Sequence, residues 1–403
     1  MRVQGNLERS LQLQIAQDQA TPGSLPGPLP PGTWEVWLDA AGLVPATPYQ
    51  LQLHGDRSER PLAQEVPFPE PVLKAEPGWY RGELHTHTLH SDGNSSVAEL
   101  VSAAQHFGLD FLVLTDHFTT SGWRELAQWA RQGPVALIRG MELTSHRGHA
   151  NLIGIERPVD IRVDDPARPL SATVEETHRA GGLFSVNHPF SNVLGWQRHD
   201  LDWAQADLME IYHHLEFQHN VLQWGLWDQL LGQGYRVVGV GATDSHQAFW
   251  GRHRLGQVFT YVAAPELSAP GILSGLRSGR VFVSLGPTLE FQAASGGKTA
   301  QMWESLPLGG RVELRAQLRG LDRPATLFVL KNGLYLAHRD FPPGDHVWEG
   351  SDLCAQPSYY RIELHAQPYQ APSPHQRFRS WDSFMAASNP VLVGAHFKSG
   401  RWK

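Results

Sequence analysis

The strongest constraint on the fold is a regular alternation, between residues 80 and 287, of short apolar runs with segments of helical periodicity. Each apolar run has the length of one buried strand, and the segments between the runs place apolar residues at helical spacing. Strands that alternate with helices form βα units, which build a largely parallel sheet with right-handed crossovers. About seven such units fit this stretch, which favours a barrel over an open sheet. We therefore expect an α/β domain over residues 80–287.

Two helices of this stretch carry recognisable signals. Ser96 and Glu99 have the spacing of a capping box, and Gly108 is a typical helix stop. This pattern predicts a helix between residues 96 and 108. The segment SAPGILSGLRSGR, residues 268–280, is expected to form the last helix of the domain.

The two flanks have a different texture. Residues 1–79 and 288–403 alternate apolar and polar positions over short pieces that are separated by Gly and Pro turns, a pattern typical of strands. We expect an N-terminal β domain over residues 1–79 that takes no part in chemistry. Over residues 288–403 we expect a C-terminal β-sandwich-like domain.

Composition limits the partners and the kind of site. The chain has 403 residues, a formal net charge of -7 and a pI near 6.3, which argue against a nucleic-acid groove or an anionic membrane surface. The single cysteine, Cys354, excludes an internal disulfide and a thiolate metal site, whereas 21 histidines favour nitrogen and oxygen ligands. Because the chain has neither an apolar signal-peptide core nor an apolar run of about 18 residues, we expect a soluble, cytoplasmic protein.

Potential metal ligands stand at or just beyond the ends of the apolar runs. In a βα barrel the carboxyl ends of the strands form one face, so residues that are distant in sequence converge there. His85 and His87 project from the same face of a strand because they are two residues apart, and Asp92 follows in a Ser-Asp-Gly turn. No single residue is diagnostic, but their repeated placement predicts a metal centre. The candidate ligands are His85, His87, Asp92, Asp116, His117, Glu142, His149, His188, Asp244 and His246.

The motifs HTHTLHSDG, TDH, GMELT, GHANLIG, NHP and GATDSH, in this order over residues 80–250, resemble the motif set of the PHP (polymerase and histidinol phosphatase) metallohydrolase superfamily. The element at Gly279–Pro287 and the segment SNPVLV are similar to the carbaryl-hydrolase-like (CehA/McbA-type) branch. The resemblance implies a distorted (β/α)7 PHP barrel with flanking β domains. It also implies two or three divalent metal ions, and mixed His and carboxylate ligands suit Zn, Mn or Fe.

The resemblance also implies how the ligands are shared. The first metal would be held by His85, His87, Glu142 and Asp244, and the second by Glu142, His149 and His188, so that Glu142 bridges the pair. A third metal would be held by Asp92, His117 and His246. Relatives of this branch commonly have Glu-x-Trp-Asn where this chain has Glu210-Ile211-Tyr212-His213. This departure concerns the substrate pocket rather than the metal centre.

These observations predict a metal-dependent hydrolase, in which a metal-bridging hydroxide attacks a phosphomonoester or phosphodiester. Glu142 is the expected catalytic bridge, and Asp244 is expected to pass a proton to the leaving group. The expected substrate-binding residues are Arg147, His213, Arg252 and Arg254. The partner would be a small-molecule phosphoester, with no role for nucleic acid or a membrane. Two alternatives stay open: a carbamate, amide or carboxyl ester hydrolase on the same metals, and a metal-binding module without catalysis.

Overall fold

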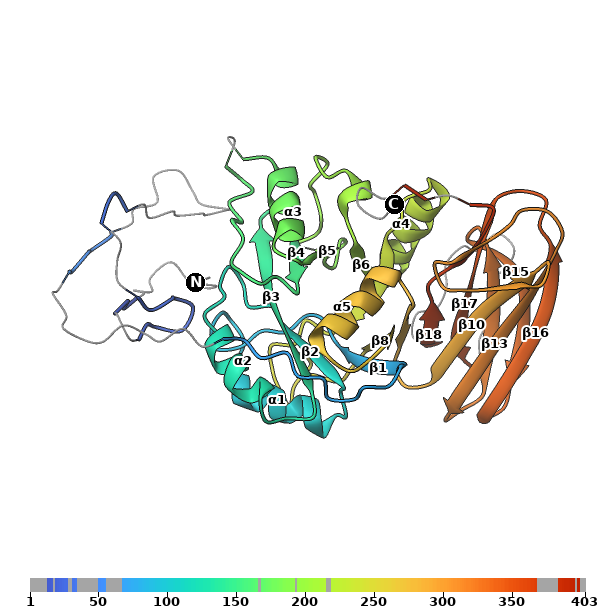
Figure 1. Cartoon of the computed structure of the whole chain (residues 1–403), viewed down its shortest axis with the longest axis horizontal. Helices are drawn as coiled ribbons and strands as arrows, with labels where there is room; N and C mark the ends of the chain where they lie inside the picture. The colour runs from blue at the N-terminus through green and yellow to red at the C-terminus, as the bar shows by residue number, and fades with distance from the viewer. Residues whose placement is uncertain are drawn as a thin grey trace.

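A computed structural model gives the structure of the chain (Figure 1). It describes residues 13–16, 19–27, 31–34, 50–55, 67–165, 168–192, 194–214, 219–367, 383–395 and 397–398. The helices are α1 (Val97–His106), α2 (Trp123–Ala130), α3 (Leu170–Arg179), η1 (Trp203–Gln205), α4 (Asn220–Gly232) and α5 (Ala269–Ser278). The strands of the α/β part are β1 (Gly78–Glu83), β2 (Phe111–Leu114), β3 (Ala136–Ser145), β4 (Gly148–Ile153), β5 (Leu183–Val186), β6 (Leu208–His213), β7 (Val238–Ala242), β8 (Phe259–Ala264) and β9 (Val281–Ser284).

The α/β part is built on one mixed sheet in which the strands run in the order β9-β8-β1-β2-β3-β4-β5-β6-β7. The pairs β1–β2 and β2–β3 are parallel, as are β5–β6 and β6–β7. Between these two parallel groups, β4 pairs antiparallel with both β3 and β5. The apolar run that contains His149 therefore forms the second strand of a hairpin, and is not a separate βα unit as the alternation had suggested.

Strand β7 ends this path, and among the described residues no closed barrel is found. On this side of β7, backbone N–H and carbonyl groups form hydrogen bonds with side chains instead of with a neighbouring strand. The Thr260 hydroxyl accepts from the Gly241 N–H and donates to the Gly241 carbonyl, while the Asn389 side chain does the same for Gly239. The expected α/β class is confirmed, and the sheet is an open, mixed one.

The helix signals read from the sequence act as expected. In α1 the Ser96 hydroxyl accepts from the Glu99 N–H at 3.2 Å, and the Glu99 carboxylate accepts from the Ser96 N–H at 2.8 Å, which confirms the capping box. Gly108 follows this helix with a positive φ of 67°, the left-handed conformation that glycine adopts without a steric penalty. The predicted last helix is α5, which begins at a Ser268 cap and ends at Gly279.

The C-terminal part is rich in strands: β10 (Thr288–Ser295), β11 (Lys298–Gln301), β12 (Ser305–Leu306), β13 (Arg311–Leu321), β14 (Ala325–Lys331), β15 (Leu334–Phe341), β16 (Gly344–Leu353), β17 (Ser358–Ala366), β18 (Phe384–Ser388) and β19 (Val391–Val393). Strands β11, β10, β13 and β16 form a separate four-stranded sheet. In contrast, β18 pairs with β9, so β12, β14, β15, β17 and β19 continue the sheet of the α/β part. The boundary at residue 287 remains a prediction.

The expected N-terminal β domain falls largely outside the described residues. Within the described residues of this region, Ile15 forms an isolated antiparallel bridge with Ala20, and residues 51–55 have no strand conformation. No helix in the part of the chain that the structure describes is long and apolar enough to cross a membrane.

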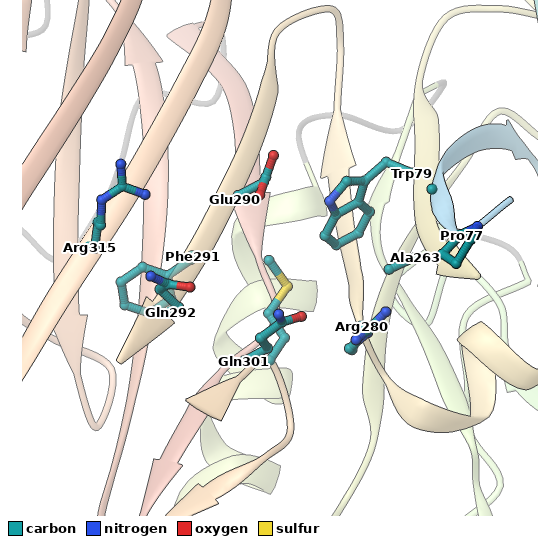
Figure 2. Close-up of a pocket in the computed structure, with 11 residues that line it drawn as sticks. Pro77, Trp79, Ala263, Arg280, Glu290, Phe291, Gln292, Gln301 and Arg315 are labelled. Carbon is teal, nitrogen blue, oxygen red and sulfur yellow. The ribbon is translucent and has the colours of Figure 1, made fainter. Parts of the chain in front are cut away.

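A small cavity lies where the α/β part meets the four-stranded sheet (Figure 2). Its volume is about 220 Å³, and Trp79, Arg280, Glu290, Gln301 and Arg315 are among its lining residues. Trp79 lies near the start of β1, whereas the candidate ligands follow the end of this strand, about 20 Å further along at ~3.3 Å per residue. The cavity is therefore separate from the candidate metal centre.

Candidate metal centre

The structure brings nine of the ten candidate ligands together. Strand β1 leads into His85 and His87, β2 into His117, β5 into His188, and β7 into Asp244 and His246. Glu142 and His149 come from the two strands of the β3–β4 hairpin, and their side chains meet. Four groups have ligand atoms that all lie within 4.8 Å of one another. They are His87–Asp92–His117–His246, His85–His87–Asp244, His85–Glu142–His188 and His188–His213–Asp244.

Glu142 is the hub of the centre. Its side chain is fully buried, and its carboxylate lies 2.6 Å from His117 Nδ1 and 3.1 Å from His149 Nδ1. Three further imidazole nitrogens lie within 3.8 Å, those of His85, His87 and His188. The two oxygens face different rings, since Oε1 faces His85, His149 and His188, whereas Oε2 faces His87 and His117. This is the geometry that a bridging carboxylate requires.

Asp92 is the second point of convergence. Its Oδ1 atom lies 3.2 Å from Nε2 of both His117 and His246. The preceding turn reaches this position because Gly93 packs directly on the chain, where an added Cβ would lie 2.5 Å from the His87 carbonyl carbon. The expected third set of ligands is thus assembled around one carboxylate.

Asp244 completes the centre beside the His-x-His pair. Its Oδ1 atom lies 2.9 Å from His87 Nε2 and 3.2 Å from His85 Nε2. An isolated parallel bridge between Thr86 and Ser245 holds the two segments side by side. In this bridge the His87 N–H donates to the Ser245 carbonyl, and the Ser245 N–H donates to the His85 carbonyl.

Three buried residues support the ligands without belonging to any of the four groups. The Glu210 carboxylate accepts from His85 Nδ1 at 2.7 Å and from the His188 N–H at 2.8 Å, which leaves His85 Nε2 free for a metal. Asn187 donates to Glu142 Oε1 at 2.9 Å. Asp116, the tenth candidate, accepts from Ser91 and from both Thr88 donors, so it anchors the loop that follows His87 and lies outside the four groups.

The electrostatics of these residues are strongly coupled. Burial would raise the pKa of Glu142, but His117, His85 and His149 hold it well below the usual range, so the carboxylate is ionised. Burial would lower the pKa of His117, but Glu142 and Asp92 raise it to about 9, and Asp244 and Asp92 likewise raise the pKa of His246 to about 9. Burial and the neighbouring His117 and His246 lower the pKa of His87 to about 3, which keeps this ring neutral.

Several candidate ligand atoms lack ordinary hydrogen-bond partners. Most buried polar atoms in proteins form hydrogen bonds, and exceptions call for an explanation such as a bound ion. Among the described residues, buried atoms without a hydrogen bond include His85 Nε2, His87 Nδ1 and Nε2, Asp92 Oδ1, His149 Nε2, His188 Nδ1 and Asp244 Oδ1. Imidazole nitrogens and carboxylate oxygens directed at one another suit divalent ions such as Zn or Mn. The residues present therefore fit a metal centre.

The backbone is strained at the same place. Five non-glycine residues in the described part of the chain have a positive φ, and three of them are His188 at 22°, Asp244 at 54° and Phe118 at 57°, the residue after His117. Such conformations cost about 1–3 kcal/mol each and persist where the surroundings hold them. This strain is concentrated where ligand side chains must turn toward a common point.

The expected substrate-binding residues lie in different surroundings. Arg252 and Arg254 are exposed on the loop after His246, where His253 packs its ring 5.4 Å from that of His246. Arg147 is half-exposed on the β3–β4 hairpin, 3.8 Å from Asp200. His213 is different, because it is only 2% exposed and belongs to one of the four ligand groups.

Residues 83–224 match the PHP domain family. An uncharacterized protein of Methanocaldococcus jannaschii is 26% identical over 157 residues, covering 35% of this chain and 88% of that protein. The error-prone DNA polymerase of Nocardia farcinica is 30% identical over 139 residues, which cover 33% of this chain and 11% of the polymerase.

Two solved structures are similar at low sequence identity. One is a two-domain protein of Bacteroides vulgatus, which contains a predicted PHP-like metal-dependent phosphoesterase and is 17% identical. The match spans 83% of this chain and the whole of that protein, with a TM-score of 0.44. An amidohydrolase of Chromobacterium violaceum, with bound sulfate and no metal, is 16% identical over 43% of this chain and 93% of its own, with a TM-score of 0.32.

Proposed function

We propose that this PHP-domain protein is a metal-dependent phosphoesterase that hydrolyses a small phosphomonoester or phosphodiester. The observation that supports this most strongly is the environment of Glu142, where one buried, ionised carboxylate faces five imidazole rings. Divalent ions bound in such a centre polarise a phosphoryl oxygen and lower the pKa of water toward neutrality. The side chains hold the ions, orient the ligands and pass protons.

In this proposal each side chain has a separate task. Glu142 would help to hold two metal ions, and Asp92, His117 and His246 would hold a third, so the proposed centre is trinuclear. Glu210 holds His85 in the tautomer whose Nε2 faces the centre. Asp244 has a carboxylate at the edge of the centre, 17% exposed, and although burial would raise its pKa, His85 and His246 hold it well below the usual range. Its ionised form would take a proton from the attacking water and pass it to the leaving group. We also propose the carbaryl-hydrolase-like branch, and Zn, Mn or Fe as the metals.

A basic rim favours phosphorus over carbon as the reacting centre. Arg252, His253 and Arg254 are exposed on the loop that follows the ligand His246. Burial, together with the nearby His213, Arg254 and His253, lowers the pKa of His214 to about 4. Guanidinium groups at this edge suit the non-reacting oxygens of a phosphate ester. A small-molecule phosphoester is therefore the proposed partner.

The same loop also supports a second candidate. Phe249 and Trp250 are 38% and 67% exposed next to the basic residues. An aryl carbamate, amide or carboxyl ester would place its ring against such aromatic side chains. For a phosphoesterase, Arg252 and Arg254 would determine the KM. For a carbamate, amide or carboxyl ester hydrolase, Phe249 and Trp250 would determine it.

The deciding experiment compares substrates on the metal-loaded protein. Nitrophenyl phosphate, bis-nitrophenyl phosphate and an aryl carbamate are assayed with the wild type, Glu142→Gln and the double variant Arg252→Gln with Arg254→Gln. We expect phosphoester turnover that Glu142→Gln abolishes, and a KM that rises about tenfold or more in the double variant with little change in kcat. Turnover of the carbamate alone, unaffected by loss of the two arginines, would move the protein to the second candidate.

A further inference from the structure

One of the four ligand groups has no counterpart in the ligand set expected from sequence. It consists of His188, His213 and Asp244, which lie at the carboxyl ends of β5, β6 and β7. These three strands are consecutive and parallel, so their carboxyl ends meet at one edge of the sheet. The juxtaposition therefore follows from the topology of this half of the sheet.

The geometry of the group is that of a small ligand cluster. His213 Nε2 lies 3.6 Å from Asp244 Oδ2, and the rings of His213 and His188 are 5.1 Å apart at 71° to each other. His213 is 2% exposed, yet within the described residues neither of its ring nitrogens has a hydrogen bond. A buried histidine with a purely structural role would be expected to use at least one nitrogen.

The position of His213 is set through its backbone. The Asn220 amide, at the start of α4, accepts from the His213 N–H at 2.8 Å and donates to the His213 carbonyl at 3.2 Å. The Gln223 side-chain amide in turn donates from Nε2 to the side-chain oxygen Oδ1 of Asn220 at 2.9 Å. The backbone at residue 213 is thus fixed by two neighbours in α4, while the imidazole is left free to bind something else.

The burial of this ring also bears on its role toward substrate. The exposed Arg252 and Arg254 can meet a ligand at the rim, whereas His213 lies within the wall formed by the strands and shares Asp244 with His85 and His87. This ring therefore lies among the candidate ligands and not at the rim. Its nitrogens are also of the ligand type that Zn, Mn and Fe accept.

We propose that His213 is a metal ligand, and that His188, His213 and Asp244 together form a divalent-cation position at the β5–β6–β7 edge of the centre. Two imidazole nitrogens and one carboxylate oxygen leave coordination positions open, as in catalytic rather than structural metal sites. This inference rests on the metal centre of the proposed function, but it does not depend on whether the substrate is an ester of phosphorus or of carbon.

The test replaces His213 in two opposite ways. His213→Phe keeps a ring of similar size and removes both nitrogens, whose loss breaks no hydrogen bond within the described residues. We expect the fold and the Tm of the metal-free protein to be retained, while one cation is lost on dialysis or its Kd rises about tenfold or more. His213→Cys instead introduces a thiolate ligand, and on titration with Co²⁺ it should show a sulfur-to-metal charge-transfer absorption band that the wild type lacks.

The exposed His338, on β15 in the C-terminal part, is the matched control position. His338→Phe and His338→Cys should leave metal content and the Co²⁺ spectrum as in the wild type. Unchanged cation number and affinity in His213→Phe, together with no band in His213→Cys, would overturn the proposal while leaving the proposed function intact. A band in His213→Cys from a protein that hydrolyses none of the test substrates would support the cation position and count against the phosphoesterase.

Discussion

At the scale of single residues, the centre depends on one carboxylate. Glu142 lies on β3 opposite Asn151 of β4, and its two oxygens face different sets of imidazoles. An imidazole can offer one nitrogen to a metal when the other is engaged, whereas a carboxylate can bind one ion with each oxygen. Loss of this charge therefore affects every metal position that it touches.

Glu142→Gln is expected to lower kcat by about a thousandfold or more, roughly 4 kcal/mol, and to reduce metal content. Gln has the size of Glu, but it lacks the charge and replaces one ligating oxygen with an NH2 group. Asp92→Asn should cost less, because Asp92 faces only His117 and His246 at the periphery. Measurements of kcat and metal stoichiometry in one buffer separate the two variants. Near-normal activity with full metal content in Glu142→Gln would rule out a bridging role.

Metal uptake should release protons. In the metal-free protein, carboxylates raise the pKa of both His117 and His246 to about 9, so both rings are protonated at pH 7 and must lose a proton to bind metal. We expect at least two protons released at pH 7, because the pKa values of His85 and His188 are raised as well, and an affinity that rises with pH until about pH 9. Calorimetric titration in two buffers with different ionisation enthalpies measures this number. Heats that do not depend on the buffer would contradict it.

The residues that sequence reasoning found share one signal. Strand-end His, Asp and Glu residues are visible as short motifs, and the parallel topology brings them together without knowledge of the side-chain geometry. Glu210 and Asn187 were not predicted, because their roles depend on which ring nitrogen they face across the sheet. Asp116 has the same local signal as the ligands, yet its hydrogen bonds to Thr88 and Ser91 engage both of its carboxylate oxygens.

At the scale of elements, α4 joins the C-terminal strands to the centre. Arg361 on β17 is fully buried. Its Nη2 atom donates to both carboxylate oxygens of Asp228 of α4 at 2.8 Å, and its guanidinium also binds Glu363. Its guanidinium lies 5.0 Å from the ring centroid of Trp224. The first residue of the same helix, Asn220, holds the backbone of His213. This connection could not be predicted from the sequence, because its partners lie far apart in the chain.

Asp228→Asn is expected to destabilise the fold by about 3 kcal/mol, because it leaves the buried Arg361 with less than full charge compensation. Urea unfolding at neutral pH measures this change. Asp322→Asn is the control, since Asp322 forms an exposed pair with Arg323 and its loss should cost less than about 1 kcal/mol. Equal effects of the two substitutions would show that the buried pair does not hold α4 in place.

The elements themselves were predicted better than their directions. A capping box and a stop glycine fix α1 locally, so its bounds follow from a few residues. An apolar run such as that of β4 has the same appearance whether it pairs parallel or antiparallel with its neighbours. The hairpin of β3 and β4, and the open end at β7, are therefore visible only in the structure.

At the scale of the whole molecule, activity and Tm should depend on bound metal and not on the thiol of Cys354. A strong chelator is expected to abolish activity and lower Tm, with recovery on adding Mn or Zn, because an ion at a thousandfold excess over its Kd stabilises the fold by about 4 kcal/mol. Cys354 is 1% exposed in the C-terminal part, so alkylation under native conditions should change neither property. Calorimetry and assays after each treatment test this. Loss of activity on alkylation without unfolding would show that Cys354 is needed for activity and would contradict the assignment of the site to the metal centre.

The pairing of β18 with β9 has a consequence for how the chain is made. Ser284 and Met385 are hydrogen-bonded although they are 101 positions apart in the chain, so β18 leaves the ribosome well after β9. During translation every candidate ligand is synthesised long before the strand that covers β9. An unpaired strand edge promotes association with other chains. A premature stop codon just before Phe384 would thus leave a nascent product with all its ligands and an uncovered edge, one that we expect to be recovered in inclusion bodies.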